Sequence, residues 1–194
     1  MEAALWEPPD EWVLDDAVIE VGERRLHAIH TPGHTQGHLV FHDPAAELLF
    51  SGDHVLPHIT PSIGLEPVVG RSPLGDFLGS LRKVRRLPDA MLLPAHGPVV
   101  PSAHARIDEL LLHHDRRLLH TRDAIRSGLS IGFEVARTLT WTSREVAFDT
   151  LPAFHRMLAV VETSAHLQLL VEQGEIAERV AGGVHHYAAM EKGA

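Results

Sequence analysis

The sequence predicts an α+β fold, in which a sheet is followed by a mainly helical segment. Through the first 100 residues, short apolar runs alternate with turn residues, as is typical of β-strands. Between residues 103 and 173, apolar residues recur every three or four positions, which indicates amphipathic helices. We therefore expect a layered sheet-and-helix domain over residues 1–100 and a second, mainly helical domain over residues 101–194.

The composition restricts the class of protein and the kind of metal site. An apolar fraction of 44% and a charged fraction of 22% argue against disorder. The formal net charge of -9 disfavours a nucleic-acid surface spread over the whole molecule. The chain has no cysteine, which excludes disulfides and thiolate metal sites. Any transition metal must therefore be held by histidine, aspartate or glutamate.

The N-terminal residues and the apolar runs bear on location. No apolar run approaches the roughly 18 residues that a membrane span needs. Residues 1–12, MEAALWEPPDEW, lack the basic and apolar regions of a secretory signal, and their two prolines favour an irregular lead-in. We expect a cytoplasmic protein without a membrane partner.

The first half of the chain predicts a hairpin and two further strands. Residues 17–29 predict a hairpin that turns at Gly22. Residues 39–41 and 48–50 predict the two further strands, with a turn at residues 43–44 between them. The second strand of the hairpin leads directly to Thr31.

A loop, a helix and a last strand complete the predicted first domain. Residues 57–73 are rich in proline and glycine and predict a long loop of the kind that is often functional. Ser72 is predicted to cap a helix that has Pro73 at its first position and ends at Pro88. Residues 91–93 then predict a buried strand.

The second half of the chain predicts three helices and a two-stranded ribbon. A long helix has one apolar face and ends at residues 127–128, and Ser130 is predicted to cap a shorter helix. A helical pattern covers residues 152–173, and Ser164 is a position at which it could divide into two helices. Residues 175–188 predict a terminal hairpin. This order is that of a winged-helix domain.

Three strand-like runs each end in a turn and then a side chain that can bind a metal. These side chains are His34 in TPGHTQGH, Asp53 in LLFSGDH and His96 in MLLPAHG. A single histidine beside a glycine turn is usually structural, but three such positions favour a cluster of metal ligands at one rim of the sheet. Imidazole and carboxylate suit zinc, iron or manganese, and one carboxylate can reach two metals.

The motifs TPGHTQGH, FSGDH and PAHG, in this order, resemble the last three metal motifs of the metallo-β-lactamase superfamily. The closest resemblance is to the glyoxalase II-like and endoribonuclease-like branch, whose extended loop is similar to residues 52–64, GDHVLPHITPSIG. The C-terminal segment resembles the winged-helix domain appended to these hydrolases. The resemblance implies the second half of an αββα sandwich, followed by that domain.

The resemblance also implies a role for each of the three ligands. Two divalent metals would be bound, zinc in the first place with iron or manganese as alternatives. His34 would bind the first metal, Asp53 would bridge both metals and be essential for catalysis, and His96 would bind the second metal. A metal-bound hydroxide would attack an ester, thioester or phosphodiester bond.

Three further histidines lie near these motifs. His38 is expected to help orient His34 without being a ligand itself. His54 and His58 lie on the loop after the aspartate, where they could reach substrate, although an exposed loop position is the favoured interpretation. The cluster at residues 113–115 lies on the long helix and is interpreted as a solvated face.

One motif of the family is not found in the sequence. The family requires an upstream His-x-His-x-Asp-His motif that supplies four ligands, and no such motif occurs among the 194 residues. We therefore expect the chain to be a fragment, a truncated reading frame or one partner of a split or intertwined assembly, and to be poorly active or inactive by itself. The sheet surface that would face the first half of the sandwich is expected to be exposed, which favours association into a homo-oligomer.

Two functions remain open at this stage. The first is a metal-dependent hydrolase that acts on a small-molecule ester or thioester, or on RNA. The alternative is a non-catalytic, truncated interaction module that oligomerises or binds nucleic acid through the winged helix. DNA is disfavoured as a partner, because residues 165–180 carry only Arg179 against Glu172, Glu175 and Glu178.

Overall fold

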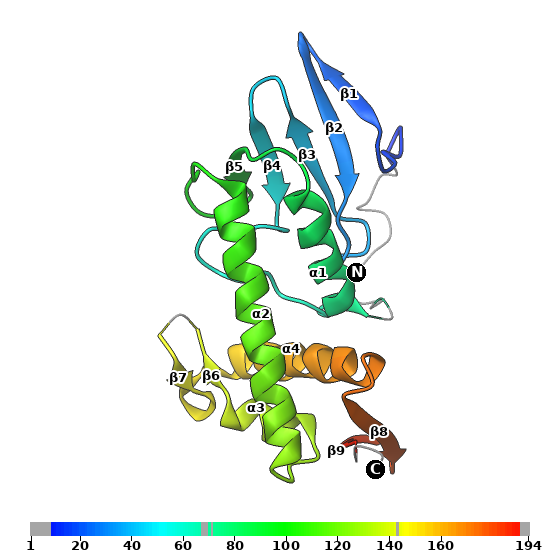
Figure 1. Ribbon diagram of the computed structural model, residues 1–194, viewed down its shortest axis with the longest axis vertical. Helices are drawn as coiled ribbons and strands as arrows, with labels where there is room; N and C mark the ends of the chain where they lie inside the picture. The colour runs from blue at the N-terminus through cyan, green and yellow to red at the C-terminus, as the bar shows by residue number, and fades with distance from the viewer. Residues whose placement is uncertain (1–8, 67–69, 71, 143, 191–194) are drawn as a thin grey trace.

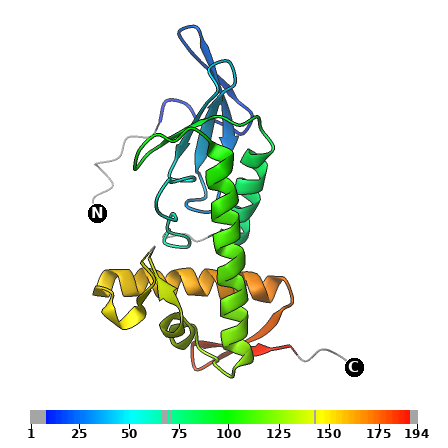
Figure 2. The ribbon, with the colours of Figure 1, turned by 60° about the vertical axis from the view of Figure 1, so that its left-hand side comes forward.

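The computed structural model describes residues 9–66, 70, 72–142 and 144–190 of the chain (Figure 1). A twisted sheet lies at one end of the molecule and a group of helices with a small ribbon lies at the other. The helix α2 (Ala103–Arg126) runs from the sheet into the helical end, as both views show (Figure 2). None of the helices in the described residues combines the length and apolar character that a membrane span requires.

The sheet has five strands in the order β1-β2-β3-β4-β5. Neighbours among the first four strands pair antiparallel, whereas β5 pairs parallel to β4. A parallel pair requires a crossover, and helix α1 (Pro73–Arg85) lies in the segment that makes it. The strands are β1 (Val18–Val21), β2 (Arg24–His30), β3 (Leu39–Asp43), β4 (Leu48–Gly52) and β5 (Met91–Pro94).

One face of the sheet forms the first hydrophobic core. Alternate side chains of the strands point to this face, where α1 and the first half of α2 cover them. Phe77 and Leu81 of α1 are fully buried there. The strand residues in this core are Ile29, Val40, Leu49 and Leu92.

The other face of the sheet is apolar as well, but the described residues cover it less. The strand register places Phe41, Phe50 and Leu93 in one row across this face, and all three side chains are partly exposed. Met91 lies on the same face and is 45% exposed. The strong alternation of buried and partly exposed residues therefore leaves an apolar surface opposite α1.

The second core lies among the helices. Helix α2 contributes to it with its last turns, and the long helix α4 (Ala153–Glu172) contributes to both cores. The predicted domain boundary near residue 100 stays a prediction. The remaining elements are α3 (Gly132–Thr138), β6 (Thr140–Trp141), β7 (Val146–Ala147), a 3-10 turn (Phe148–Thr150), β8 (Ile176–Ala181) and β9 (Val184–Ala189).

Most predicted elements are confirmed, while several local details are wrong. Ser72 precedes α1 but makes no side-chain cap, because its hydroxyl donates to the carboxylate of Glu172. Ile131, not Ser130, is the residue before α3. Ser164 does not divide α4, since its hydroxyl donates to the carbonyl of Val160 within one continuous helix. The short β6–β7 hairpin was not predicted.

The cluster at residues 113–115 is only in part a solvated face. His114 is fully buried, and its Nδ1 lies 3.1 Å from Nε2 of His166 on α4. The Nδ1 of His166 lies 2.8 Å from the carbonyl oxygen of Glu162, so it must carry the proton. His166 Nε2 is then an acceptor, and His114 Nδ1 donates to it. This pair of neutral rings links α2 to α4.

Burial of this pair makes stability depend on pH. Burial lowers the pKa of His166 to about 4, and that of His114 lies well below its usual value. The folded chain therefore resists protonation that the unfolded chain accepts, so the contribution of this pair to stability is constant above about pH 6.5 and falls between about pH 6.5 and 4. The unfolding free energy of His166→Gln should fall less than that of the wild type between about pH 7 and 5, by about 2 kcal/mol.

Urea unfolding at both pH values measures this difference. His155→Gln is the matched control, because His155 lies on the same helix and is exposed. The control should keep the slope of the wild type. An unchanged slope in His166→Gln would show that the buried pair is not the source of the pH dependence.

Candidate metal centre

The direction of the strands brings the three predicted ligands to one edge of the sheet. β2 ends at this edge and β3 begins there, so the loop that carries His34 lies at the edge. β4 and β5 both end at the same edge because they run parallel. The backbone N–H of Ala95 donates to the carbonyl of Gly52 over 2.9 Å, which joins the turns that carry Asp53 and His96.

Asp53 lies between the two histidines. Its Oδ1 is 3.4 Å from Nε2 of His96, and its Oδ2 is 4.0 Å from Nε2 of His34. A tetrahedral metal with bonds of about 2.0–2.1 Å holds two ligand atoms about 3.4 Å apart. Each histidine therefore faces a different oxygen of Asp53, at or slightly beyond the separation that a shared metal would require.

The ring of His34 is held in the tautomer that a ligand needs. Its Nδ1 lies 2.8 Å from the carbonyl oxygen of Ser62, and a carbonyl only accepts. The proton is therefore on Nδ1, which leaves the lone pair of Nε2 directed toward Asp53. Backbone carbonyls often orient metal-binding histidines in this way.

His38 holds the backbone of Asp53, and its ring also lies edge-to-face with that of His34, with the centroids 6.3 Å apart. Its predicted role in orienting His34 stays a prediction. The backbone N–H of Asp53 donates to Nε2 of His38 over 3.1 Å, and Nδ1 of His38 lies 2.8 Å from Oγ1 of Thr31. Nε2 accepts, so the proton is on Nδ1. Burial lowers the pKa of His38, which keeps the ring neutral and able to accept.

The two loop histidines differ in their surroundings. His54 is fully buried against the Phe77 ring, with the centroids 5.1 Å apart, so its predicted exposure is wrong. Burial lowers its pKa to about 3. His58 is exposed, as expected, and lies at the mouth of a cavity next to the candidate centre. His54 faces the core because Asp53 and His54 point to opposite sides of the turn.

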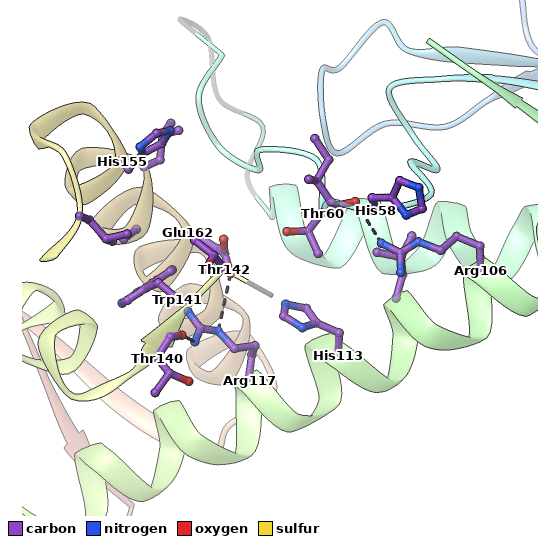
Figure 3. Close-up of a pocket in the computed structure, with 15 residues that line it drawn as sticks. His58, Thr60, Arg106, His113, Arg117, Thr140, Trp141, Thr142, His155 and Glu162 are labelled. Carbon is purple, nitrogen blue, oxygen red and sulfur yellow. Dashed lines mark hydrogen bonds and ion pairs between the residues drawn. The ribbon is translucent and has the colours of Figure 1, made fainter. Parts of the chain in front are cut away.

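Two adjoining cavities open at this edge. The first, of about 450 Å³, is lined by His34, Asp53 and His96 together with the loop over residues 59–63 and part of α4. The second, of about 490 Å³, lies between that loop, α2, β6 and α4 (Figure 3). Sequence reasoning did not identify its polar residues Arg106, Arg117 and Glu162, because they lie far apart in the sequence and match no motif.

The donor types fit a metal pair, but the number of donors is small. The chain could offer each of two metals one imidazole and one oxygen of the carboxylate of Asp53. Among the residues that the structure describes, no group of three or more side chains has the arrangement to hold a metal ion. Two donors for each metal predict weak metal binding.

Residues 1–96 match the sequence model of the metallo-β-lactamase superfamily. The chain belongs to this superfamily. An atrochrysone carboxyl ACP thioesterase of Paecilomyces divaricatus is 31% identical over 182 residues, which are 92% of this chain and 55% of the relative. A protein with the same description from Aspergillus fumigatus is 26% identical over 189 residues, covering 94% of this chain and 57% of the relative.

Solved structures of the superfamily share the fold. A β-lactamase domain protein from Burkholderia ambifaria is 28% identical, with a TM-score of 0.84 over 95% of this chain and 53% of that chain. A metallo-β-lactamase family protein from Thermus thermophilus is 27% identical, with a TM-score of 0.75 over 92% of this chain and 54% of that chain. Members of the superfamily usually bind divalent metals. This superfamily chain spans about half the length of the curated relatives it matches.

The turn before Asp53 requires a glycine. Gly52 has φ of 53°, and a Cβ at this position would lie 2.7 Å from Nε2 of His38. Gly52→Ala should therefore both strain the backbone and displace His38 from the N–H of Asp53. We expect a loss of about 1–3 kcal/mol in unfolding free energy.

Gly79→Ala is the control for this substitution. Gly79 lies inside α1, and a Cβ there would meet no atom within 4 Å. Alanine favours the helix, so the control should gain about 0.5–1 kcal/mol. Denaturant unfolding measures both values, and equal effects of the two substitutions would contradict a special role for the turn at Gly52.

Proposed function

We propose that this chain carries the hydrolytic site of a metal-dependent thioesterase. The observation that supports it is the position of Asp53, whose two oxygens face two different histidines at the mouth of a cavity. The curated relatives described as ACP thioesterases support the thioester as the bond that is cleaved. A cytoplasmic location is part of the same proposal.

The residues divide the metal-binding roles between them. His34 and Oδ2 of Asp53 would hold one metal, and His96 and Oδ1 of Asp53 would hold the other. Zinc is proposed, with iron or manganese as alternatives, because nitrogen and oxygen donors suit all three. A divalent metal at this place would supply Lewis acidity and lower the pKa of bound water to about 7.

The surrounding residues hold the donors and shape the substrate cavity. His38 and Thr31 fix the backbone at Asp53, and the carbonyl of Ser62 fixes the ring of His34. Ser62 lies on the loop that also lines the cavity, so the same loop would orient the metal-binding His34 and contact the substrate. The apolar side chains of Leu56, Ile59 and Ile63 line the cavity and favour an acyl group over a polar substrate.

An ester, a phosphodiester and RNA are less well supported as substrates. A phosphodiester chain needs an extended surface of positive charge, whereas the net charge of this protein is -9. A small ester shares the chemistry of a thioester but lacks the support of the named relatives.

Removal of Asp53 provides the direct test. With excess zinc, the chain should hydrolyse an acyl thioester faster than the background, although slowly because each metal has few protein ligands. Asp53→Ala should reduce the rate to the background and also reduce bound zinc from two ions toward none, because both half-sites lose an oxygen. Thiol release measures the rate and elemental analysis measures the metal.

Asp149→Ala is the matched control, since Asp149 is an exposed carboxylate that pairs with Arg137 far from the edge. It should change neither the rate nor the zinc content. Hydrolysis that survives in Asp53→Ala would contradict the bridging role. Zinc binding without any hydrolysis by the wild-type chain would contradict the thioesterase and favour the alternative below.

The second candidate is a non-catalytic interaction module. The row of Phe41, Phe50 and Leu93 on the open face of the sheet favours it, because apolar surface of this kind marks association. The order of α2, α3, α4 and the β8–β9 ribbon also resembles a winged helix. Nucleic-acid binding by this segment is the weaker form of the proposal, given the acidic residues around Arg179.

Sedimentation velocity tests this second candidate. We expect the wild-type chain to form a homo-oligomer at moderate concentration, and Phe50→Gln should shift it toward the monomer by removing the central apolar ring of the row. Phe133→Gln is the control, because Phe133 is 51% exposed on α3, away from the sheet. A wild-type monomer would mean that the open face does not mediate association.

A further inference from the structure

The lining of the second cavity combines two arginines of α2 with apolar side chains. Figure 3 shows the ring of His113 between the side chains of Arg117 and Arg106, with Trp141 and Glu162 beside Arg117. Its volume of about 490 Å³ is within the range of small-molecule sites. The apolar part of the lining consists of Ile59, Leu110, Leu151, Leu158, Ala159 and the Trp141 ring.

Arg117 is the central polar group of this cavity. Its guanidinium carbon lies 4.1 Å from the centroid of the Trp141 ring, and its Nη1 donates to the carbonyl of Thr140 over 2.8 Å. Only 9% of its side chain is exposed. These contacts fix the orientation of the guanidinium, while Nη2 has no hydrogen-bond partner among the described residues.

Glu162 compensates Arg117 incompletely. Its Oε1 lies 3.6 Å from Nε of Arg117, which is an ion pair but longer than a hydrogen bond. Burial raises the pKa of Glu162 and lowers the pKa of Arg117, and the attraction between the two groups opposes both shifts. Desolvation and the nearby Arg117, Arg106 and Arg116 all lower the pKa of His113.

The cavity adjoins the candidate metal centre. Ile59, Thr60, Leu158 and Glu162 line both cavities, so a molecule can extend from Asp53 into the space above Arg117. The guanidinium of Arg117 is fixed in orientation, retains a free N–H donor and is surrounded by apolar side chains. This arrangement suits a ligand that is apolar over most of its length and ends in an anion.

We propose that this cavity binds the acyl group of the substrate, and that this acyl group is apolar and carries a carboxylate that pairs with Arg117. The assignment of the ligand as an acyl group rests on the proposed thioesterase function. The preference of the cavity for an apolar carboxylate rests on the residues above alone. Trp141 and Leu158 would pack against the hydrocarbon, and Nη2 of Arg117 would donate to the carboxylate.

Decanoate and decan-1-ol form a matched pair of probes for this preference. Both present the same hydrocarbon, but only decanoate carries the charge. Calorimetric titration of the full chain without added metal should show decanoate binding about tenfold or more tightly than decan-1-ol. The indole N–H resonance of Trp141, assigned with Trp141→Phe, should shift with both probes and so locate them in the cavity.

Two variants separate recognition of the carboxylate from the integrity of the cavity. Glu162→Gln removes the competing anion and should tighten decanoate binding several-fold without changing decan-1-ol binding. In the double variant Arg117→Met/Glu162→Met the whole pair is replaced, so no buried charge is left unpaired. Its affinity for decanoate should fall to that for decan-1-ol, and retained decan-1-ol binding would show that the cavity is intact.

Equal affinities of the wild type for the two probes would overturn the proposal, as would an absence of binding or a preference that survives in the double variant. If the double variant no longer binds decan-1-ol, its cavity is not intact and Glu162→Gln decides instead. This variant must still bind decanoate more tightly than decan-1-ol if Arg117 recognises the carboxylate. These titrations involve neither zinc nor hydrolysis. A failure of the thioesterase proposal is therefore distinguishable from a failure of the carboxylate pocket.

Discussion

The parallel pairing of β4 with β5 is the constraint on which the rest of the site depends. Antiparallel neighbours would end at opposite edges, whereas this pair places Asp53 and His96 at one edge. The pairing requires a crossover, and α1 within that crossover supplies Phe77 and Leu81 to the core beneath the sheet. The same contacts that stabilise the first half of the chain therefore determine where the candidate ligands meet.

A small polar network then sets the orientation of each ligand. Thr31, His38 and the backbone of Asp53 form a chain of hydrogen bonds that is largely buried, and each ring nitrogen of His38 has one partner. A buried network of this kind destabilises the fold when one of its polar groups lacks a hydrogen-bond partner. When every group has a partner, the network fixes the orientation of its side chains. The network explains why Gly52 cannot carry a side chain, since any Cβ would occupy the space of the His38 ring.

Local patterns predicted the strands, the long helices and the convergence of His34, Asp53 and His96 at one rim. They could do so because a strand end or a glycine turn is determined by a few consecutive residues. The hydrogen bond between His38 and Asp53 could not be predicted, since it depends on how the turn after β4 folds back.

The burial of His114 was obscured by its charged neighbour Asp115, although its spacing from Leu110 places it on the apolar face of α2. The cavity residues Arg117, Trp141 and Glu162 come from three elements and share no local signal.

The helical segment therefore contributes to the candidate site and not only to the stability of the fold. α2 and α4 enter both cores, and the His114–His166 hydrogen bond joins them beside the wall that carries Glu162. A shift of α4 relative to α2 would change the separation of Glu162 and Arg117, and with it the charge presented to a ligand. Leu158 and Glu162 of α4 line the cavity at the candidate centre, which favours a role of this segment in binding the substrate of that centre.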